Sequence, residues 1–309
     1  MDEGDHRDHE AERRLLALRA DHALDERWQQ DGVDADVRHA ALDALAEIKP
    51  GPEMTVPLLV QALQDKDDAV IRRSLHALAE RGAAIVPAMI EAMKDDRTEF
   101  YALLVLHEIG PEAKGAVPAI CDLIHENNEP YQRQEAAMTL GMIGPGAVAA
   151  VPDLITLLDD REAGVQRAAV FALGMIGPPA APAAEAIREH LDSNDPFSWV
   201  AGSWALAKIF PGNENIKKTT ARFLAQMLAD PDEHVRRMAA QALLDLKPGL
   251  PITLPALEAA LGNADPKVVN DTLIALAGLG DAAVPVLIKA LEYPGARESV
   301  AELIQQLGP

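Results

Sequence analysis

The residues in this sequence best suited to metal chemistry are its histidines. Three of them stand directly before a glutamate, in His9-Glu10, His107-Glu108 and His125-Glu126. Imidazole and carboxylate groups together can hold iron or zinc. The three pairs fall at unrelated positions of the repeat described below. Stacked helices would therefore not bring them to one point.

A second set of histidines, His39, His76 and His107, lies roughly one repeat apart. If each sits on a different helix of a stack, neighbouring axes are about 8–10 Å apart. A row across two such steps cannot converge on one ion. We expect solvated surface histidines, and we predict no metal site and no cofactor.

Nucleophilic and phosphate-binding motifs are also missing. Two Gly-Met-Ile-Gly segments, Gly141–Gly144 and Gly174–Gly177, follow helical patterns rather than strands, so helix C-caps explain them better than a dinucleotide site. The sequence has no Gly-x-Ser-x-Gly elbow and no zincin helix. The single Cys121 excludes an intramolecular disulfide, and its neighbours predict a buried thiol. We predict no catalytic residue and no enzyme.

These glycines belong to a longer repeat that organises the chain. The segment Leu140–Pro145 returns unchanged 33 residues later as Leu173–Pro178. Weaker copies place an anchor leucine at Leu45, Leu78, Leu106, Leu140, Leu173, Leu206, Leu243 and Leu276, with Ile304 in the ninth copy. Stacked helical hairpins have periods in this range. The predicted fold is all-α, a right-handed α-solenoid of about nine helical hairpins.

Each repeat has the pattern of two helices. The first often opens with Val-Pro, since proline is accepted at the first helical position: Val56-Pro57, Val86-Pro87, Val117-Pro118, Val151-Pro152 and Val284-Pro285. The second carries apolar or small residues four, eight and eleven positions after an apolar origin such as Val165, which places them on one helix face. Gly-Pro then predicts a left-handed C-cap.

Charged residues flank the origin of the second helix. An acid lies three residues before it, where it can cap the helix: Asp34, Asp67, Asp95, Glu129, Glu162, Asp195, Asp232 and Asp265. An arginine lies one or two residues after it: Arg38, Arg72, Arg133, Arg167, Arg236 with Arg237, and Arg297. In the sixth repeat Trp199 and Val200 replace the arginine.

From residue 24 to 309 this pattern resembles the HEAT-like repeats common in bacteria and often labelled by similarity to phycobilin lyases. The resemblance implies that the turn acid and the early arginine form a ladder between successive repeats. The residues assigned to this role are Asp34, Asp67, Glu162, Asp232, Arg38, Arg72, Arg167 and Arg237. It also leaves open an alternative function, a bilin lyase-like or metal-dependent HEAT-like enzyme or cofactor protein with its site in the concave groove.

Net charge and the pattern of the terminal residues indicate which classes of partner to expect and how the chain is divided into domains. The formal net charge of −21 disfavours nucleic acid and anionic membranes, and it can attract a basic partner. We expect a disordered acidic tail over residues 1–9, then a single solenoid over 10–309 with an N-terminal capping helix. The N-terminus has no signal-peptide pattern, so we expect a cytoplasmic protein.

The leading hypothesis is a non-catalytic protein-binding scaffold or adaptor. Positions two, six and nine after the origin point away from the buried stripe, and in the central repeats they are apolar. The predicted partner-binding residues of the concave groove are Phe100, Leu104, Met138, Phe171, Val200 and Trp204. Acids on its rim, Glu80, Glu108 and Asp245, suit a partner helix or peptide with basic flanks. Gly141 and Gly174 are expected to leave open space beside them. The alternative is that neighbouring second helices bury these side chains.

Overall fold

The computed structural model describes residues 35–48, 52–126, 129–191, 195–246, 257, 260–261, 265–277, 284–293, 296–297 and 300. Every regular element in these ranges is an α-helix or a short 3-10 helix, which confirms the all-α prediction. The predicted tail and N-terminal capping helix lie outside the described residues. The right-handed superhelix and the continuous solenoid over 10–309 stay predictions.

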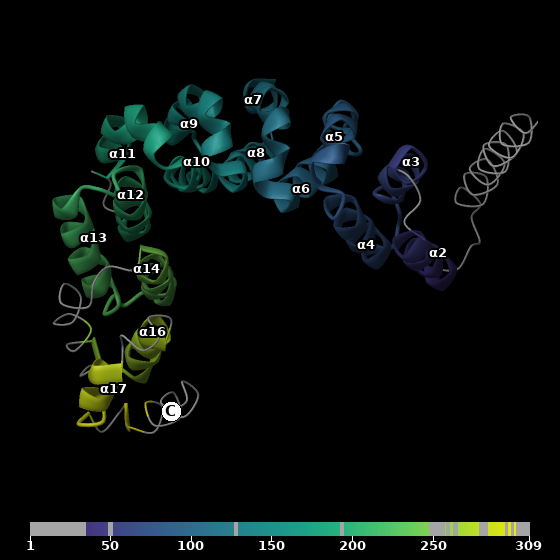
Figure 1. Cartoon of the computed structure of the whole chain (residues 1–309). Coiled ribbons are helices and arrows are strands. Elements are labelled where there is room, and N and C mark those ends of the chain that lie inside the picture. Colours follow the sequence, from purple (N-terminus) through teal and green to yellow (C-terminus); the bar gives the residue numbers. More distant parts are fainter. Residues whose placement is uncertain are drawn as a thin grey trace, which may run out of the picture. The chain divides into compact units, whose positions relative to one another are not determined.

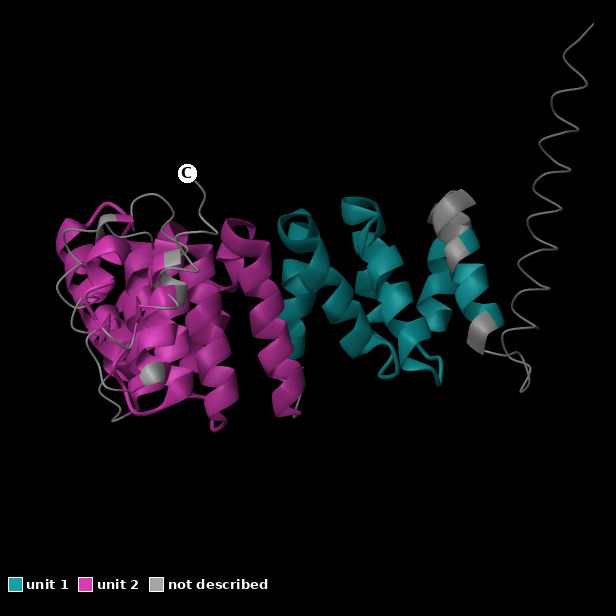
Figure 2. Cartoon of the chain, turned by 90° about the horizontal axis from the view of Figure 1, so that it is seen from below, with its two compact units in different colours: residues 1–126 teal, residues 127–309 magenta. Residues whose placement is uncertain are grey.

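The chain divides into two compact units, Met1–Glu126 and Asn127–Pro309 (Figure 2). The first unit contains α2 (Ala35–Ile48), α3 (Pro52–Ala62), α4 (Asp68–Ala79), η1 (Gly82–Ile85), α5 (Val86–Ala92), α6 (Glu99–Ile109), η2 (Gly110–Ala116) and α7 (Val117–Glu126).

The second unit continues the same alternation. It contains α8 (Pro130–Ile143), η3 (Gly144–Ala150), α9 (Val151–Thr156), η4 (Leu157–Asp159), α10 (Ala163–Ile176), η5 (Pro178–Ala183), α11 (Ala184–His190), α12 (Pro196–Ile209), α13 (Glu214–Met227), α14 (Glu233–Leu246), α16 (Pro266–Ala277) and α17 (Val284–Ala290).

Within each unit the helices form two rows (Figure 1). In the second unit α9, α11 and α13 make one row, and α8, α10, α12, α14 and α16 make the other, with α10 in contact with both α8 and α12. The anchor leucines fill the space between the rows, and those whose side chains are described are buried: Leu78, Leu106, Leu140, Leu173, Leu206, Leu243 and Leu276. The apolar periodicity therefore identified the core face of each second helix.

Glycine followed by proline ends three of the second helices as predicted. Gly110, Gly144 and Gly177 have φ of +64°, +68° and +73°. Their ψ values of −129°, −137° and −139° lie outside the left-handed helical region that we expected. Only glycine adopts this combination without strain. It turns the chain into a 3-10 segment that leads to the next hairpin.

Val-Pro marks a helix start in four of its five occurrences. Helices α5, α7, α9 and α17 all begin at the valine. The prediction is wrong for Val56-Pro57, because α3 begins at Pro52 and holds Pro57 inside the helix. A 3-10 helix precedes Val-Pro at α5, α7 and α9, but in α3 the residues before Val-Pro are already α-helical. A mid-helix proline lacks the N–H that would bond one turn back.

One helical run, Pro130–Asp159, is long and apolar enough by composition to cross a membrane. Half of its most apolar window is buried inside the unit. The run turns at Gly144 and passes through η3, so it comprises two helices of one hairpin. Core helices of soluble proteins have this composition.

Candidate binding groove between three second helices

An apolar groove lies between α10, α12 and α14, all within the second unit. Its volume is about 440 Å³, within the range of ordinary ligand pockets. The lining residues are Arg167, Phe171, Met175, Val200, Ala201, Trp204, Met238, Gln241, Ala242 and Asp245. Three consecutive repeats contribute to it, so only the stacked structure creates this site.

An aromatic stack forms the floor of the groove. The rings of Phe171 and Trp204 are parallel to within 6°, with centroids 5.6 Å apart. Trp204 Nε1 donates to Asp245 Oδ2 at 2.7 Å, which links α12 to α14. Lys208 Nζ lies 3.2 Å from the same carboxylate oxygen and 5.8 Å from the centre of the indole ring. These contacts hold the indole in one orientation, so the groove is preorganised.

The two glycines of the repeated hexapeptide explain how the rings fit. A Cβ on Gly174 would lie 3.0 Å from two ring carbons of Trp204. A Cβ on Gly141 would lie 3.3 Å from the ring of Phe171. The expectation of open space beside these glycines is therefore wrong, because an aromatic ring from the next second helix occupies it.

The predicted partner-binding residues divide into three groups. Phe171, Val200 and Trp204 line the groove, but Val200 is 0% and Trp204 8% exposed, so they form its floor. Met138, on α8, is partly exposed beside the groove without lining it. Phe100 and Leu104 are partly exposed on α6, in the first unit. Burial by neighbouring helices, the stated alternative, therefore applies to Val200 and Trp204, while a binding role for the others stays a prediction.

The periodicity missed several residues of the groove. Met175, Met238, Gln241 and Ala242 lie on the same three helices as the predicted residues. Met238 and Ala242 fall three and seven positions after their origin, next to the positions two and six that we used. A helix face about 100° wide includes them, so a broader stripe would have found them.

Arginines do connect successive repeats, at the position directly after the origin. Arg38 on α2 donates to Asp65 at 2.7 and 2.8 Å. Arg133 on α8 donates to Asp160 at 2.9 and 3.0 Å. Both acids lie in the turn before the next second helix. Arg236 on α14 reaches Asp271 on α16 at 2.9 Å instead.

Three of the assigned arginines do not take part in these contacts between repeats. Arg72, Arg167 and Arg237 follow the origin by two residues and are exposed. Successive residues are about 100° apart around a helix. The residue directly after the origin therefore borders the buried stripe, and the residue two positions after the origin faces away from it. Arg237 pairs with Glu233 on its own helix.

Two of the assigned acids cap their own helices, and one of these, Asp67, also lies 3.7 Å from His39 Nε2 on α2. Asp67 and Asp232 accept backbone N–H bonds from Ala69 and His234 at 2.8 Å, as N-caps do. The Glu162 amide donates to Asp160 at 2.9 Å, and the Glu162 side chain makes no cap. Asp34 lies outside the described residues.

The pKa of Asp160 shows how the contact between Arg133 and Asp160 affects the carboxylate. Burial by itself would raise the pKa of this carboxyl, but hydrogen bonds from the Arg133 guanidinium and the Glu162 amide outweigh it and lower the pKa. A carboxylate with a lowered folded-state pKa stabilises the fold fully above its unfolded-state value of about 3.9. That contribution is lost as the pH falls through the folded-state pKa.

Among the residues that the structure describes, no group of three His, Cys, Asp or Glu side chains is placed to hold a metal ion. His76 Nδ1 lies 2.8 Å from Glu108 Oε1 on the next second helix. The hydrogen bond and charge of Glu108 raise the pKa of His76. This exposed pair connects α4 and α6 as a surface contact.

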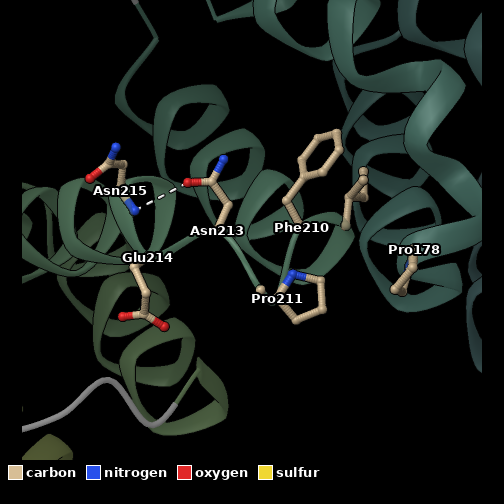
Figure 3. Close-up of a pocket in the computed structure, with 8 residues that line it drawn as sticks. Pro178, Phe210, Pro211, Asn213, Glu214 and Asn215 are labelled. Atoms are coloured by element: carbon tan, nitrogen blue, oxygen red, sulfur yellow. Dashed lines mark hydrogen bonds between the residues drawn. The ribbon is translucent and has the colours of Figure 1, made fainter.

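A second hollow, of about 640 Å³, lies where α12 gives way to α13. Figure 3 shows Pro178, Phe210 and Pro211 beside it, with Asn213 accepting a hydrogen bond from the Asn215 amide. It is lined partly by the exposed link 211–213 and by the first two residues of α13, Glu214 and Asn215. We regard it as a consequence of the longer connection in this repeat and not as a binding site.

Replacing Gly212 in that link with alanine is expected to raise the free energy of unfolding by about 0.4–1 kcal/mol. A Cβ there would meet nothing within 4 Å, and φ is not positive, so the variant only restricts the unfolded chain. Denaturant midpoints measure the change. Gly177→Ala is the control and should destabilise, because φ is +73° at that position. A lowered midpoint for Gly212→Ala would contradict this account of the link.

Comparison with known families gives a consistent picture of the fold. The family model described as HEAT repeats matches residues 30–110, 117–207 and 203–277, and the PBS lyase HEAT-like repeat matches residues 272–293. No curated protein matches the sequence. Similar solved structures include YibA of Escherichia coli, at 18% identity and a TM-score of 0.50, with 91% of this chain and 99% of that chain covered.

Two larger proteins are also similar in structure. Kap95p, in a complex with RanGDP, has 15% identity and a TM-score of 0.58, with 96% of this chain and 47% of that chain covered. Kap121p, bound to Pho4p, has 14% identity and a TM-score of 0.59, with 94% and 37% covered. This chain thus spans less than half the length of those two chains. At such identities the likeness shows the α-solenoid fold alone.

Proposed function

Because the chain belongs to the HEAT-repeat family, we propose that it is a non-catalytic scaffold or adaptor that binds a protein or peptide between α10, α12 and α14. The observation that carries this proposal is the apolar groove with a fixed aromatic floor. Apolar surface of this kind on a protein with 25% charged residues is typical of an interaction site.

The groove has the composition expected of a binding surface. Its aromatic rings are rigid, and Met175 and Met238 at its walls can adapt to side chains of different shape. Kap95p and Kap121p are described in complexes with other proteins, RanGDP and Pho4p. Solenoids of this general fold therefore do bind proteins, which supports the same class of partner here.

The rim acids that suggested basic flanks are already engaged. Glu80 and Glu108 lie on either side of His76 in the first unit, and Asp245 binds Trp204 and Lys208 in the second. Basic flanks on the partner therefore lose their main support at the groove. The net charge of −21 still acts at long range on any basic partner.

The test is affinity capture with tagged full-length protein and two matched methionine variants. Met238→Asp places a charge on the groove wall and should weaken capture of a stoichiometric partner at least tenfold. Met227→Asp is the control, because Met227 is equally part-exposed but lies on α13 and outside the groove. Circular dichroism establishes that both variants remain folded.

Equal capture by the two variants would place the binding surface elsewhere on the chain. A copurifying metal or visible chromophore, without a protein partner, would support the rival hypothesis of a HEAT-like enzyme or cofactor protein instead.

A further inference from the structure

The charges that line the groove are not equally engaged. Asp245 accepts a hydrogen bond from Trp204 Nε1 and pairs with Lys208 at 3.2 Å. Arg167 is exposed at the start of α10 and forms no hydrogen bond or ion pair with any residue that the structure describes. Of the two charged side chains that line the groove, the one without a partner among the described residues is therefore positive.

This local charge is opposite to the charge of the whole protein. A net charge of −21 attracts cations at long range. At physiological ionic strength, however, the Debye length is about 8 Å, so distant acids are screened at the groove. Charges in direct contact lie well within that length, so they still attract each other. Arg167 therefore decides which charge the groove accepts, and a guanidinium binds a carboxylate through two parallel hydrogen bonds.

The position of Arg167 relative to the apolar floor limits how far apart two side chains of a bound peptide can be if one contacts the floor and the other contacts Arg167. Arg167 precedes Phe171 by four residues on α10, a rise of about 6 Å along the helix axis. An apolar side chain seated on the Phe171–Trp204 stack would thus place a residue two or three positions away within reach of the guanidinium. Gln241, exposed at the opposite wall, adds an amide that can bond to a peptide backbone.

We infer that the groove takes a peptide segment in which a bulky apolar residue stands two or three positions from an aspartate or glutamate. The apolar residue packs against Phe171, Met175 and Met238, and the carboxylate pairs with Arg167. This inference rests on the proposed function. It reverses the expectation of basic flanks, because the only acid that lines the groove is already bonded within the protein.

The experiment uses three synthetic ten-residue peptides with blocked ends and a central Leu-Phe pair. They differ only in the residue three positions to each side of this pair, which is Asp, Asn or Lys. Each is titrated against isotope-labelled full-length protein, and the indole N–H resonance of Trp204 reports occupancy of the groove. The Trp204→Phe variant assigns this resonance.

We expect the Asp peptide to bind about two- to fivefold more tightly than the Asn peptide, as for an exposed ion pair, and the Lys peptide to bind most weakly. Arg167→Glu should reverse this order without unfolding the protein, because Arg167 is exposed. Arg72→Glu is the matched control: it makes the same charge change at the equivalent position of α4, which does not line the groove, and should keep the preference for Asp.

The other outcomes separate the two proposals. If the three peptides bind equally, or if Arg167→Glu changes nothing, the carboxylate inference is wrong and the binding groove stands. Tighter binding of the Lys peptide overturns it in favour of basic flanks. If no peptide shifts the Trp204 resonance, the groove is not a peptide site, and the proposed function fails with the inference.

Discussion

Replacing Arg236 with methionine while Asp271 stays in place should lower the free energy of unfolding by about 3–5 kcal/mol. The side chains of this pair are 2% and 7% exposed, and Nε lies 2.9 Å from the carboxylate. Arg236 also donates to the carbonyls of Asp230 and Pro231, at 2.9 and 3.2 Å. The substitution therefore leaves a buried carboxylate without its cation and two carbonyls without their donor.

Urea denaturation of the full chain measures this effect, and two further variants identify its cause. Changing both partners, Arg236→Met with Asp271→Leu, should recover most of the loss, since a buried ion pair often contributes little net stability over an apolar pair of similar volume. Arg237→Met changes the adjacent but exposed arginine and should cost less than about 1 kcal/mol. If Arg237→Met proved as harmful as Arg236→Met, burial would not be the reason.

Trp204→Ala is expected to cost about 3–5 kcal/mol of folding stability, as large-to-small substitutions of buried aromatics do. Trp204 is only 8% exposed, stacks on Phe171 and closes the space over Gly174. Its removal also leaves Asp245 without the indole N–H donor. The groove floor is thus part of the core, and truncating it should damage the fold as well as any binding.

Two controls separate packing from hydrogen bonding in this prediction. Trp204→Phe keeps a ring over Gly174 but loses the bond to Asp245, so its cost should fall to about 1–3 kcal/mol. Trp199→Ala removes the neighbouring indole, which is 39% exposed, and should cost clearly less than Trp204→Ala. Equal losses for Trp199→Ala and Trp204→Ala would mean that Trp204 does not close the core.

Much of the fold could be predicted because its determinants are local. The conformation of Gly144 and the start of α8 at Pro130 depend on backbone preferences of those residues. The buried leucines follow from a 3.6-residue period, which each helix expresses by itself. Errors arose where context overrides a local preference, as at Pro57, which lies inside α3 although Val-Pro starts a helix elsewhere.

The candidate site could be predicted only partly from the sequence, and the tertiary structure supplied the rest. Helical periodicity selected Phe171 and Trp204, and the structure places both in the groove. Periodicity could not say how much of each side chain the neighbouring repeat covers, because that depends on the spacing between helices. The contact between Trp204 and Gly174 joins residues from different repeats and sets that spacing.

The roles of the arginines show the same division. The sequence by itself determined that most second helices begin with an acid, and six of them with an early arginine, since both positions repeat. Only the tertiary structure decided that Arg133 is a buried rung while Arg167 is the exposed cation of a groove. The physical reason is a rotation of about 100° per residue, which carries one guanidinium towards the turn of the next repeat and the other towards solvent.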